Sequence, residues 1–222
     1  MNLFDIVGPV MVGPSSSHTA GAVKIGLTAR RLLDDEIKEA VIDFHGSFLS
    51  TGKGHGTDKA VVAGLAGMAV DDPEIPDSFE AAEKKGISFT FGSVDLGDDA
   101  HPNSVRISLK GTGGKTLEMT AASIGGGQIQ VQEIDGLKAV FSGDHPTLIV
   151  QNDDTPGVIA DVALTLSSNN INIATLQLTR DSRGGKAAAV IETDQEIPED
   201  AMYWLAHQDG VQKVTYLSLK EN

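Results

Sequence analysis

Two segments near the start of the sequence combine residue types that bind anions and transfer protons. In the first, residues 13–19 read GPSSSHT and lie at the start of a helix expected over 18–33. The free N–H groups and positive dipole of a helix start suit a carboxylate or phosphate. A single serine would suffice as a plain helix cap, so the longer run favours a binding role. The candidate residues of this segment are Ser15, Ser16, Ser17, His18 and Thr19.

The second segment, residues 50–58, reads STGKGHGTD within a glycine-dense loop expected over 46–57. Its glycines let the backbone approach a ligand. Lys53 supplies a cation, and His55 can act as a base near neutral pH. Gly54 stands where a Walker loop requires serine or threonine, and the dinucleotide fingerprint is also missing. The alternative is a surface turn that simply precedes a capped helix.

The remaining histidines carry weaker signals. Residues 101–103 read HPN, which is typical of a turn because Pro102 restricts the residue before it. His45 ends an apolar strand, whereas His145 and His207 are expected to be solvated. No His-Glu-x-x-His spacing occurs, so we expect no metal site built by this chain alone.

Charge and composition exclude several classes of protein. With 17 Lys and Arg against 31 Asp and Glu among 222 residues, the net charge is −14, which repels nucleic acids and anionic lipids. The apolar runs fall short of the roughly 20 residues that span a bilayer, and the first residues lack a basic signal region. We therefore expect a cytoplasmic protein. The chain has no cysteine, which excludes disulfides and thiolate ligation of a metal by this chain alone.

The elements that must position these residues follow from periodicity. Toward the C-terminus, strand and helix patterns alternate in the order βαββαβ, which predicts a ferredoxin-like fold. Before it, the pattern predicts a mixed α/β domain, so the chain as a whole belongs to the α+β class. Its Ala/Gly-rich helix over 58–70 has a small face and should pack closely. A linker over 142–146 divides the chain into domains 1–142 and 147–222.

The segments 13–19 and 51–58, together with LFDI at 3–6, resemble the iron–sulfur-dependent L-serine dehydratases. The form of this family with separate subunits has a β chain of this length that ends in an ACT domain, in agreement with the βαββαβ pattern. The N-terminal domain is similar to the allosteric-substrate-binding domain of some phosphoglycerate dehydrogenases. The resemblance therefore covers essentially the whole chain.

The resemblance implies a lyase that converts L-serine to pyruvate and ammonia. In this family a 4Fe-4S cluster has three cysteine ligands and one open iron, which binds the substrate hydroxyl as a Lewis acid. Those cysteines belong to an α chain, which fits their absence here. This chain would then be active only with its α chain.

The resemblance also implies roles for single residues. His55 is the first candidate for the base that removes the α-proton, and His18 is the second. Lys53 would steady the carboxylate or the developing charge, and Asn103 would bind the substrate amine or carboxylate. The donors for the substrate carboxylate would be Ser15, Ser16, Ser17 and Thr19.

ACT domains that sense amino acids bind them between two domains, near the first strand-to-helix turn. Asn152, Asp154 and Asn172 match the serine-binding positions, although an acid at 154 replaces the usual neutral amide. The resemblance implies a homodimer through paired ACT sheets. Dimerisation without ligand sensing is the alternative.

Two rival functions are less favoured. A non-catalytic amino-acid-sensing subunit explains the C-terminal domain but leaves both histidine segments without a role. A pyridoxal-phosphate dehydratase would use Lys53 as its Schiff base, but such enzymes are usually larger, and no phosphate cradle follows this lysine. The β-subunit interpretation accounts for both halves of the chain.

Overall fold

The computed structural model describes residues 10–219, and its residue contacts divide the chain into two compact units, Met1–Asp135 and Gly136–Asn222. The sequence predicts the linker slightly later, at 142–146. The LFDI segment at 3–6 lies outside the described residues. Among the residues described, no helix is both long and apolar enough to cross a membrane.

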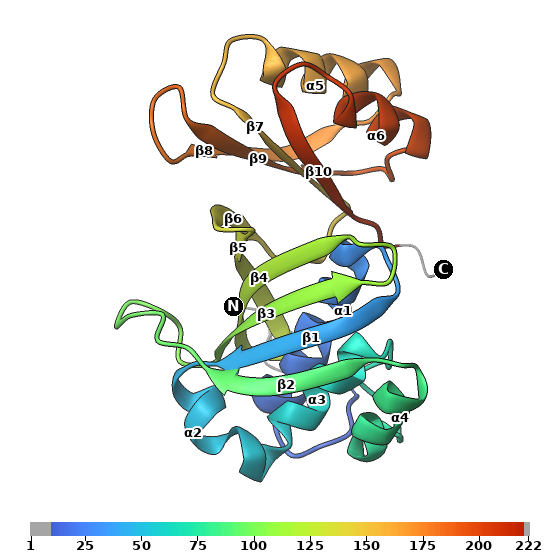
Figure 1. The fold of residues 1–222 in the computed structure, drawn as a ribbon, viewed down its shortest axis with the longest axis vertical. Coiled ribbons are helices and arrows are strands. Elements are labelled where there is room, and N and C mark those ends of the chain that lie inside the picture. The colour runs from blue at the N-terminus through green and yellow to red at the C-terminus, as the bar shows by residue number, and fades with distance from the viewer. Residues whose placement is uncertain (1–9, 220–222) are drawn as a thin grey trace. The chain divides into compact units, whose positions relative to one another are not determined.

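The first unit places helices on a mixed sheet (Figure 1). Within it the strand order is β2-β1-β3-β4-β5, in which β1 and β2 are parallel and the other pairs antiparallel. Its helices are η2 (Ser16–Ala20), α1 (Gly21–Leu33), α2 (Gly46–His55), α3 (Thr57–Leu65), η3 (Ile75–Asp77) and α4 (Ser78–Lys84). Its strands are β1 (Ile37–Phe44), β2 (Ser88–Ser93), β3 (Ser104–Gly111), β4 (Thr116–Gly125) and β5 (Gln128–Ile134).

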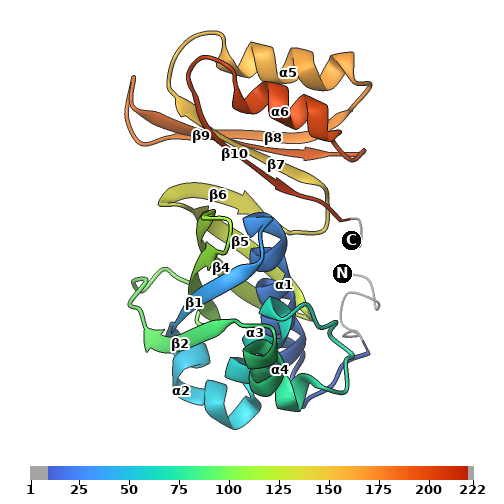
Figure 2. The same ribbon diagram turned by 45° about the vertical axis from the view of Figure 1, so that its right-hand side comes forward.

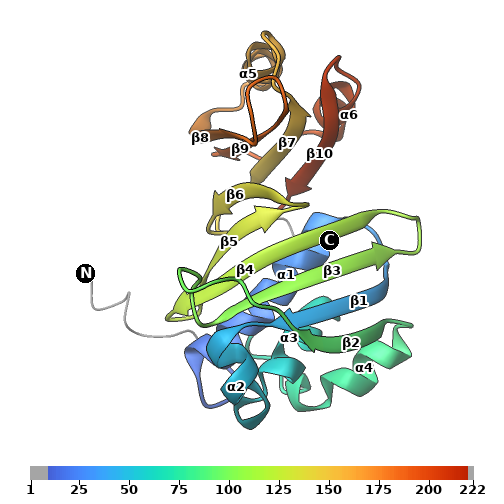
Figure 3. The ribbon, with the colours of Figure 1, turned by 60° about the vertical axis from the view of Figure 1, so that its left-hand side comes forward.

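A row of apolar side chains across the sheet forms the core of this unit. Ile42 of β1 lies opposite Ile107 of β3, which lies opposite Met119 of β4, and all three are fully buried. Helix α1 packs against β3, β4 and β5, and α3 packs against α1 (Figure 3). Burial of this apolar area is the main force that holds the unit together.

Helices α1 and α3 cross through glycines. A Cβ atom at Gly26 would overlap the carbonyl oxygen of Val61, and one at Gly64 would overlap that of Val23. The backbones therefore approach more closely than any side chain allows. This contact confirms the close packing predicted from the small residues of the second helix.

The prediction of a loop over 46–57 is wrong, because this segment forms α2 and the first residue of α3. Two contacts outside the segment make it helical. Phe48 is 1% exposed and anchors the helix in the core, while the carbonyl of Pro102 accepts hydrogen bonds from the N–H groups of Ser47 (2.6 Å) and Phe48 (3.3 Å). Gly56, with φ of 70°, separates the two helices.

The second unit has the predicted βαββαβ order. After β6 (Leu137–Phe141), its elements are β7 (Thr147–Asp153), α5 (Val158–Ser168), β8 (Ile173–Arg180), β9 (Lys186–Thr193), α6 (Glu199–Ala206) and β10 (Val211–Leu217). The antiparallel sheet has the order β10-β7-β9-β8, and both helices cover one of its faces (Figure 2). Buried residues such as Leu148, Val162 and Leu205 form the core between the sheet and the helices.

Candidate active site

The serine segment begins η2 as the sequence predicts. Ser15 is the N-cap residue, and its Oγ accepts a hydrogen bond from the His18 N–H at 3.1 Å. Ser16 and Ser17 are partly exposed in the first turn, where unpaired N–H groups favour an anion. Thr19 differs from them because it is only 3% exposed, and its hydroxyl makes no hydrogen bond within residues 10–219.

The fold brings His18 and His55 together from two separate elements. Their ring centroids are 4.8 Å apart, although His18 belongs to η2 and His55 ends α2. His18 Nε2 lies 3.1 Å from the hydroxyl of Thr51, and His55 Nδ1 lies 3.1 Å from the carbonyl oxygen of the same residue. His55 is exposed and His18 partly buried, so the pair lies where a substrate can reach it.

The surroundings of His18 favour its neutral form. Partial burial lowers the pKa of His18 below 6.5, and the neighbouring His55 lowers it further, while the main chain of Ser47 acts more weakly in the opposite direction. A neutral imidazole can accept a proton at neutral pH, as a general base must.

The lowered pKa of His18 predicts how stability depends on pH. The His18 ring binds its second proton more tightly in the unfolded state than in the folded state. The stabilisation that the neutral His18 ring contributes to the free energy of unfolding is therefore fully present above pH 6.5. It is lost as the pH falls from there through the lowered pKa. We expect denaturant unfolding at about pH 7.5 and about pH 5.5 to show that acid lowers the free energy of unfolding less in His18→Gln than in the wild type. Equal losses in both proteins would contradict this assignment.

Lys53 lies beside the histidine pair but in a different environment. It lines a cavity of about 310 Å³ together with Phe44, Phe48, Leu49, Gly52, Asp58, Phe91, Gly92 and Ser93. Phe48 lines this cavity and also contacts the His18 ring edge-on, with centroids 5.3 Å apart. Residues two apart on a helix point in different directions, so Lys53 and His55 do not share one face of α2.

The HPN segment is more closely connected to the site than its sequence suggests. The Asn103 N–H donates to His101 Nδ1 at 3.1 Å, and the Pro102 carbonyl accepts from the start of α2. Gly46, with φ of 55°, is required there, because a Cβ atom would come within 2.6 Å of the Pro102 oxygen. Asn103 therefore lies next to the residues that begin the His55 helix.

Sequence reasoning missed two contributors, Ser47 and Thr51. Both lie on the face of α2 that carries His55, at intervals of four residues. Ser47 Oγ lies 3.4 Å from His18 Nε2 and 3.3 Å from Thr51 Oγ1. The four-residue spacing of Ser47, Thr51 and His55 was the available signal. Residues four apart share a face only in a helix, and the sequence predicted a loop there.

The predicted ligand residues of the second unit do not converge within one chain. Asn152 pairs with Ala187 at one end of β9, whereas Ile173, which follows Asn172, pairs with Thr193 at the other end. Asn172 and the turn after β7 therefore lie at opposite ends of β9 in one chain, and the ligand site expected between two ACT domains stays a prediction.

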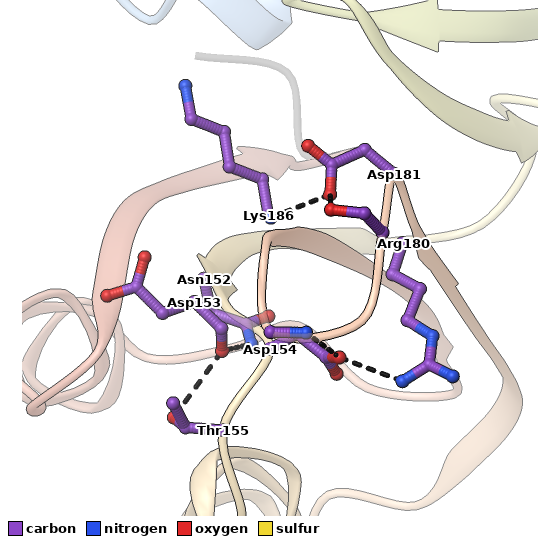
Figure 4. A network of polar contacts seen from close by, with 9 residues as sticks. Asn152, Asp153, Asp154, Thr155, Arg180, Asp181 and Lys186 are labelled. Carbon is purple, nitrogen blue, oxygen red and sulfur yellow. Dashed lines mark hydrogen bonds and ion pairs between the residues drawn. The ribbon is translucent and has the colours of Figure 1, made fainter.

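The turn after β7 is held by its own polar network (Figure 4). The Asp154 carboxylate accepts from Arg180 Nη1 at 2.8 Å and from the Gly184 N–H at 2.9 Å. The hydrogen bond from the Gly184 N–H lowers the pKa of Asp154, and the hydrogen bond and charge of Arg180 lower it further. Asn152 is 3% exposed, donates to the Asp153 carbonyl at 2.6 Å, and has a buried Oδ1 without a partner among the described residues.

Comparison with known proteins identifies the class to which this fold and site belong. A family model described as the serine dehydratase beta chain matches residues 2–88, and a model of the ACT domain matches residues 147–202. The second match confirms the ferredoxin-like ACT domain that the C-terminal pattern predicts.

Full-length relatives narrow the assignment. The chain is 40% identical over 217 residues to the probable L-serine dehydratase beta chain of Bacillus subtilis (strain 168), with 98% of both chains covered. It is 37% identical over 196 residues to the L-serine dehydratase beta chain of Peptoniphilus asaccharolyticus, with 88% of both covered. It is also 27% identical to the D-3-phosphoglycerate dehydrogenase of Bacillus subtilis (strain 168), over 89% of this chain and 37% of that enzyme. This chain belongs to the serine dehydratase beta chain family.

Proposed function

We propose that this chain is the β subunit of a lyase that converts L-serine to pyruvate and ammonia together with a cysteine-bearing α chain. The observation that carries the proposal is the His18–His55 pair, with ring centroids 4.8 Å apart beside the helix start that Ser15 caps. The family membership supports the same activity. A purely amino-acid-sensing subunit would leave this pair without a function.

Elimination of water from serine needs a base for the α-proton and donors for the carboxylate. His55 is the first candidate for the base because it is exposed, and His18 is the second. Ser15, Ser16 and Ser17 with the N–H groups of η2 suit the carboxylate. Loss of the α-proton and the β-hydroxyl leaves an enamine, whose hydrolysis gives pyruvate and ammonia.

Three further candidates have secondary roles. Lys53 supplies a positive charge for the carboxylate or the enolate-like charge that develops as the proton leaves. Asn103 binds the amine or the carboxylate from the segment whose Pro102 carbonyl contacts the start of α2. Thr19 is buried, so its hydroxyl acts on substrate only if η2 rearranges when the α chain binds.

The residues of this chain do not fit an iron–sulfur cluster. The sequence has no cysteine, and residues 10–219 contain no group of His, Asp and Glu arranged to hold a metal ion. We therefore assign the 4Fe-4S cluster of this family to cysteines of the α chain, where it would supply Lewis-acid chemistry.

An anaerobic pull-down with tagged β chain from its own cells tests this proposal. We expect a cysteine-bearing chain to co-purify with iron and to give pyruvate that depends on L-serine. Recovery of the β chain alone, or with a partner that lacks iron, would favour the sensing subunit instead.

The second unit suggests a homodimer. Strand β8 is an edge of its sheet and exposes Leu176 (40%) and Leu178 (49%). Edge strands of this kind pair readily with a second copy. In an antiparallel β8 pair centred on Leu176, Asn172 of one copy lies opposite Arg180 of the other, and Arg180 bonds to Asp154. Dimerisation would thus bring together the ligand residues that one chain separates.

Calorimetry of the β chain with L-serine distinguishes sensing from dimerisation alone. Because Asn152 Oδ1 is buried without a partner among the described residues, we expect binding heat that Asn152→Ala abolishes. The exposed Ser168→Ala at the end of α5, outside the proposed β8 pair, is the control and should keep the heat. Absence of heat at millimolar L-serine in a dimeric wild type would leave the ACT domain with dimerisation only.

A further inference from the structure

Thr51 contacts both histidines of the site through different atoms. Its hydroxyl lies 3.1 Å from His18 Nε2, and its carbonyl oxygen lies 3.1 Å from His55 Nδ1. The roles proposed for the other residues of the 51–58 segment leave this threonine unexplained.

The hydroxyl hydrogen of Thr51 is already committed. It is donated to the carbonyl of Ser47, one helical turn earlier, at 2.8 Å, as helical threonines commonly do. A threonine hydroxyl has one hydrogen and two acceptor lone pairs, so toward His18 it can only accept. The shorter hydrogen bond of His18 Nε2, to Thr51, then requires a hydrogen on this nitrogen, toward which the Ser47 hydroxyl at 3.4 Å is also an acceptor.

The carbonyl of Thr51 determines which nitrogen of the His55 ring carries the hydrogen. A carbonyl oxygen only accepts hydrogen bonds, so His55 Nδ1 must also carry a hydrogen. His207 shows the same arrangement just after α6, where its Nδ1 lies 2.7 Å from the carbonyl oxygen of Tyr203. This recurrence provides an internal reference for the His55 tautomer.

We propose that Thr51 is a positioning residue that fixes the ring orientations and tautomers of both histidines, leaving His18 Nδ1 and His55 Nε2 to accept protons. The inference rests on the proposed function, since it assigns reactive atoms to the bases proposed there. Within residues 10–219, neither of these two nitrogens accepts a hydrogen bond. Each can therefore face the substrate without a prior tautomer exchange.

Nitrogen-resolved NMR of the histidine rings in the full β chain tests the assignment directly, because the spectra identify which nitrogen is protonated. In the wild type we expect hydrogen on Nε2 of His18 and on Nδ1 of both His55 and His207. In Thr51→Val, the His18 signals should shift while those of His55 and His207 stay in place. Hydrogen on Nδ1 of wild-type His18 would overturn the proposal.

Kinetics of the enzyme reconstituted with its α chain supply the second readout. Loss of a partner that orients a metal-bound imidazole typically costs 10–100-fold, and by analogy we expect kcat of Thr51→Val to fall about tenfold with a smaller change in KM. Thr51→Ser keeps the hydroxyl and should restore most of the activity. The matched control is Ser50→Ala, which removes an exposed hydroxyl of the same helix and should leave kcat unchanged.

The outcomes separate this inference from the proposed function. If His55→Ala and His18→Ala both retain activity, the assignment of the bases fails whatever Thr51 does. If those variants are inactive while Thr51→Val keeps kcat, its pH profile and the His18 spectrum, only the positioning role fails.

Discussion

Replacement of His55 by alanine is expected to abolish turnover of the reconstituted lyase, with kcat lowered about 10²–10⁴-fold. The ring of His55 is exposed, lies 4.8 Å from that of His18, and has its Nδ1 held by Thr51. Alanine removes the proton acceptor but preserves the helix, because alanine is the best helix former. Steady-state formation of pyruvate from L-serine measures the effect.

The matched control for this variant is His207→Ala. His207 also lies at the end of a helix and bonds through Nδ1 to a carbonyl four residues earlier, but it belongs to the second unit. It should leave turnover unchanged. Iron content and cluster absorbance of the α chain should be the same in both variants. Activity of His55→Ala within about tenfold of the wild type would show that another residue is the base.

Replacement of Gly64 by alanine is expected to destabilise the first unit by about 3 kcal/mol. The added Cβ atom would overlap the carbonyl oxygen of Val23, a backbone atom that cannot rotate away, so α1 and α3 must move apart. Guanidinium unfolding of the β chain measures the change. Because α1 follows η2 and α3 follows α2, the same shift separates the histidines and should lower kcat as well.

Gly54→Ala provides the control for stability. Gly54 lies inside α2, and nothing lies within 4 Å of the position of its Cβ atom. Alanine there should stabilise the protein by up to about 1 kcal/mol, since glycine weakens a helix interior. Equal unfolding energies for the two variants would show that the helix crossing tolerates a larger separation.

The second unit was predictable from sequence because its signals are local. Strands alternate, helices keep their three- and four-residue spacing, and turn residues separate them, as in the segment 152–157 before α5. The separation of Asn172 from the turn after β7, in contrast, depends on the register of β8 on β9. Register is a property of paired strands and cannot be derived from one strand alone.

In the first unit, local signals and tertiary contacts disagree over α2. Its glycines indicate a loop, but burial of Phe48 and the hydrogen bonds to Pro102 stabilise a helix. Pro102 is distant in sequence, so this stabilisation is invisible to local reasoning. The sequence nominated both histidines as candidates from their types and neighbours, and their catalytic roles stay predictions. Their mutual distance and their link through Thr51 required the fold.

The parallel pairing of β1 and β2 has a consequence for how the site works. Helix α2 follows β1 directly, and α3 and α4 complete the connection to β2, so this connection as a whole is fastened to the sheet at both ends. Such a connection resists swinging open as a lid would. The entropic cost of holding the two histidines close together is met once, when the chain folds. It does not recur in every catalytic cycle.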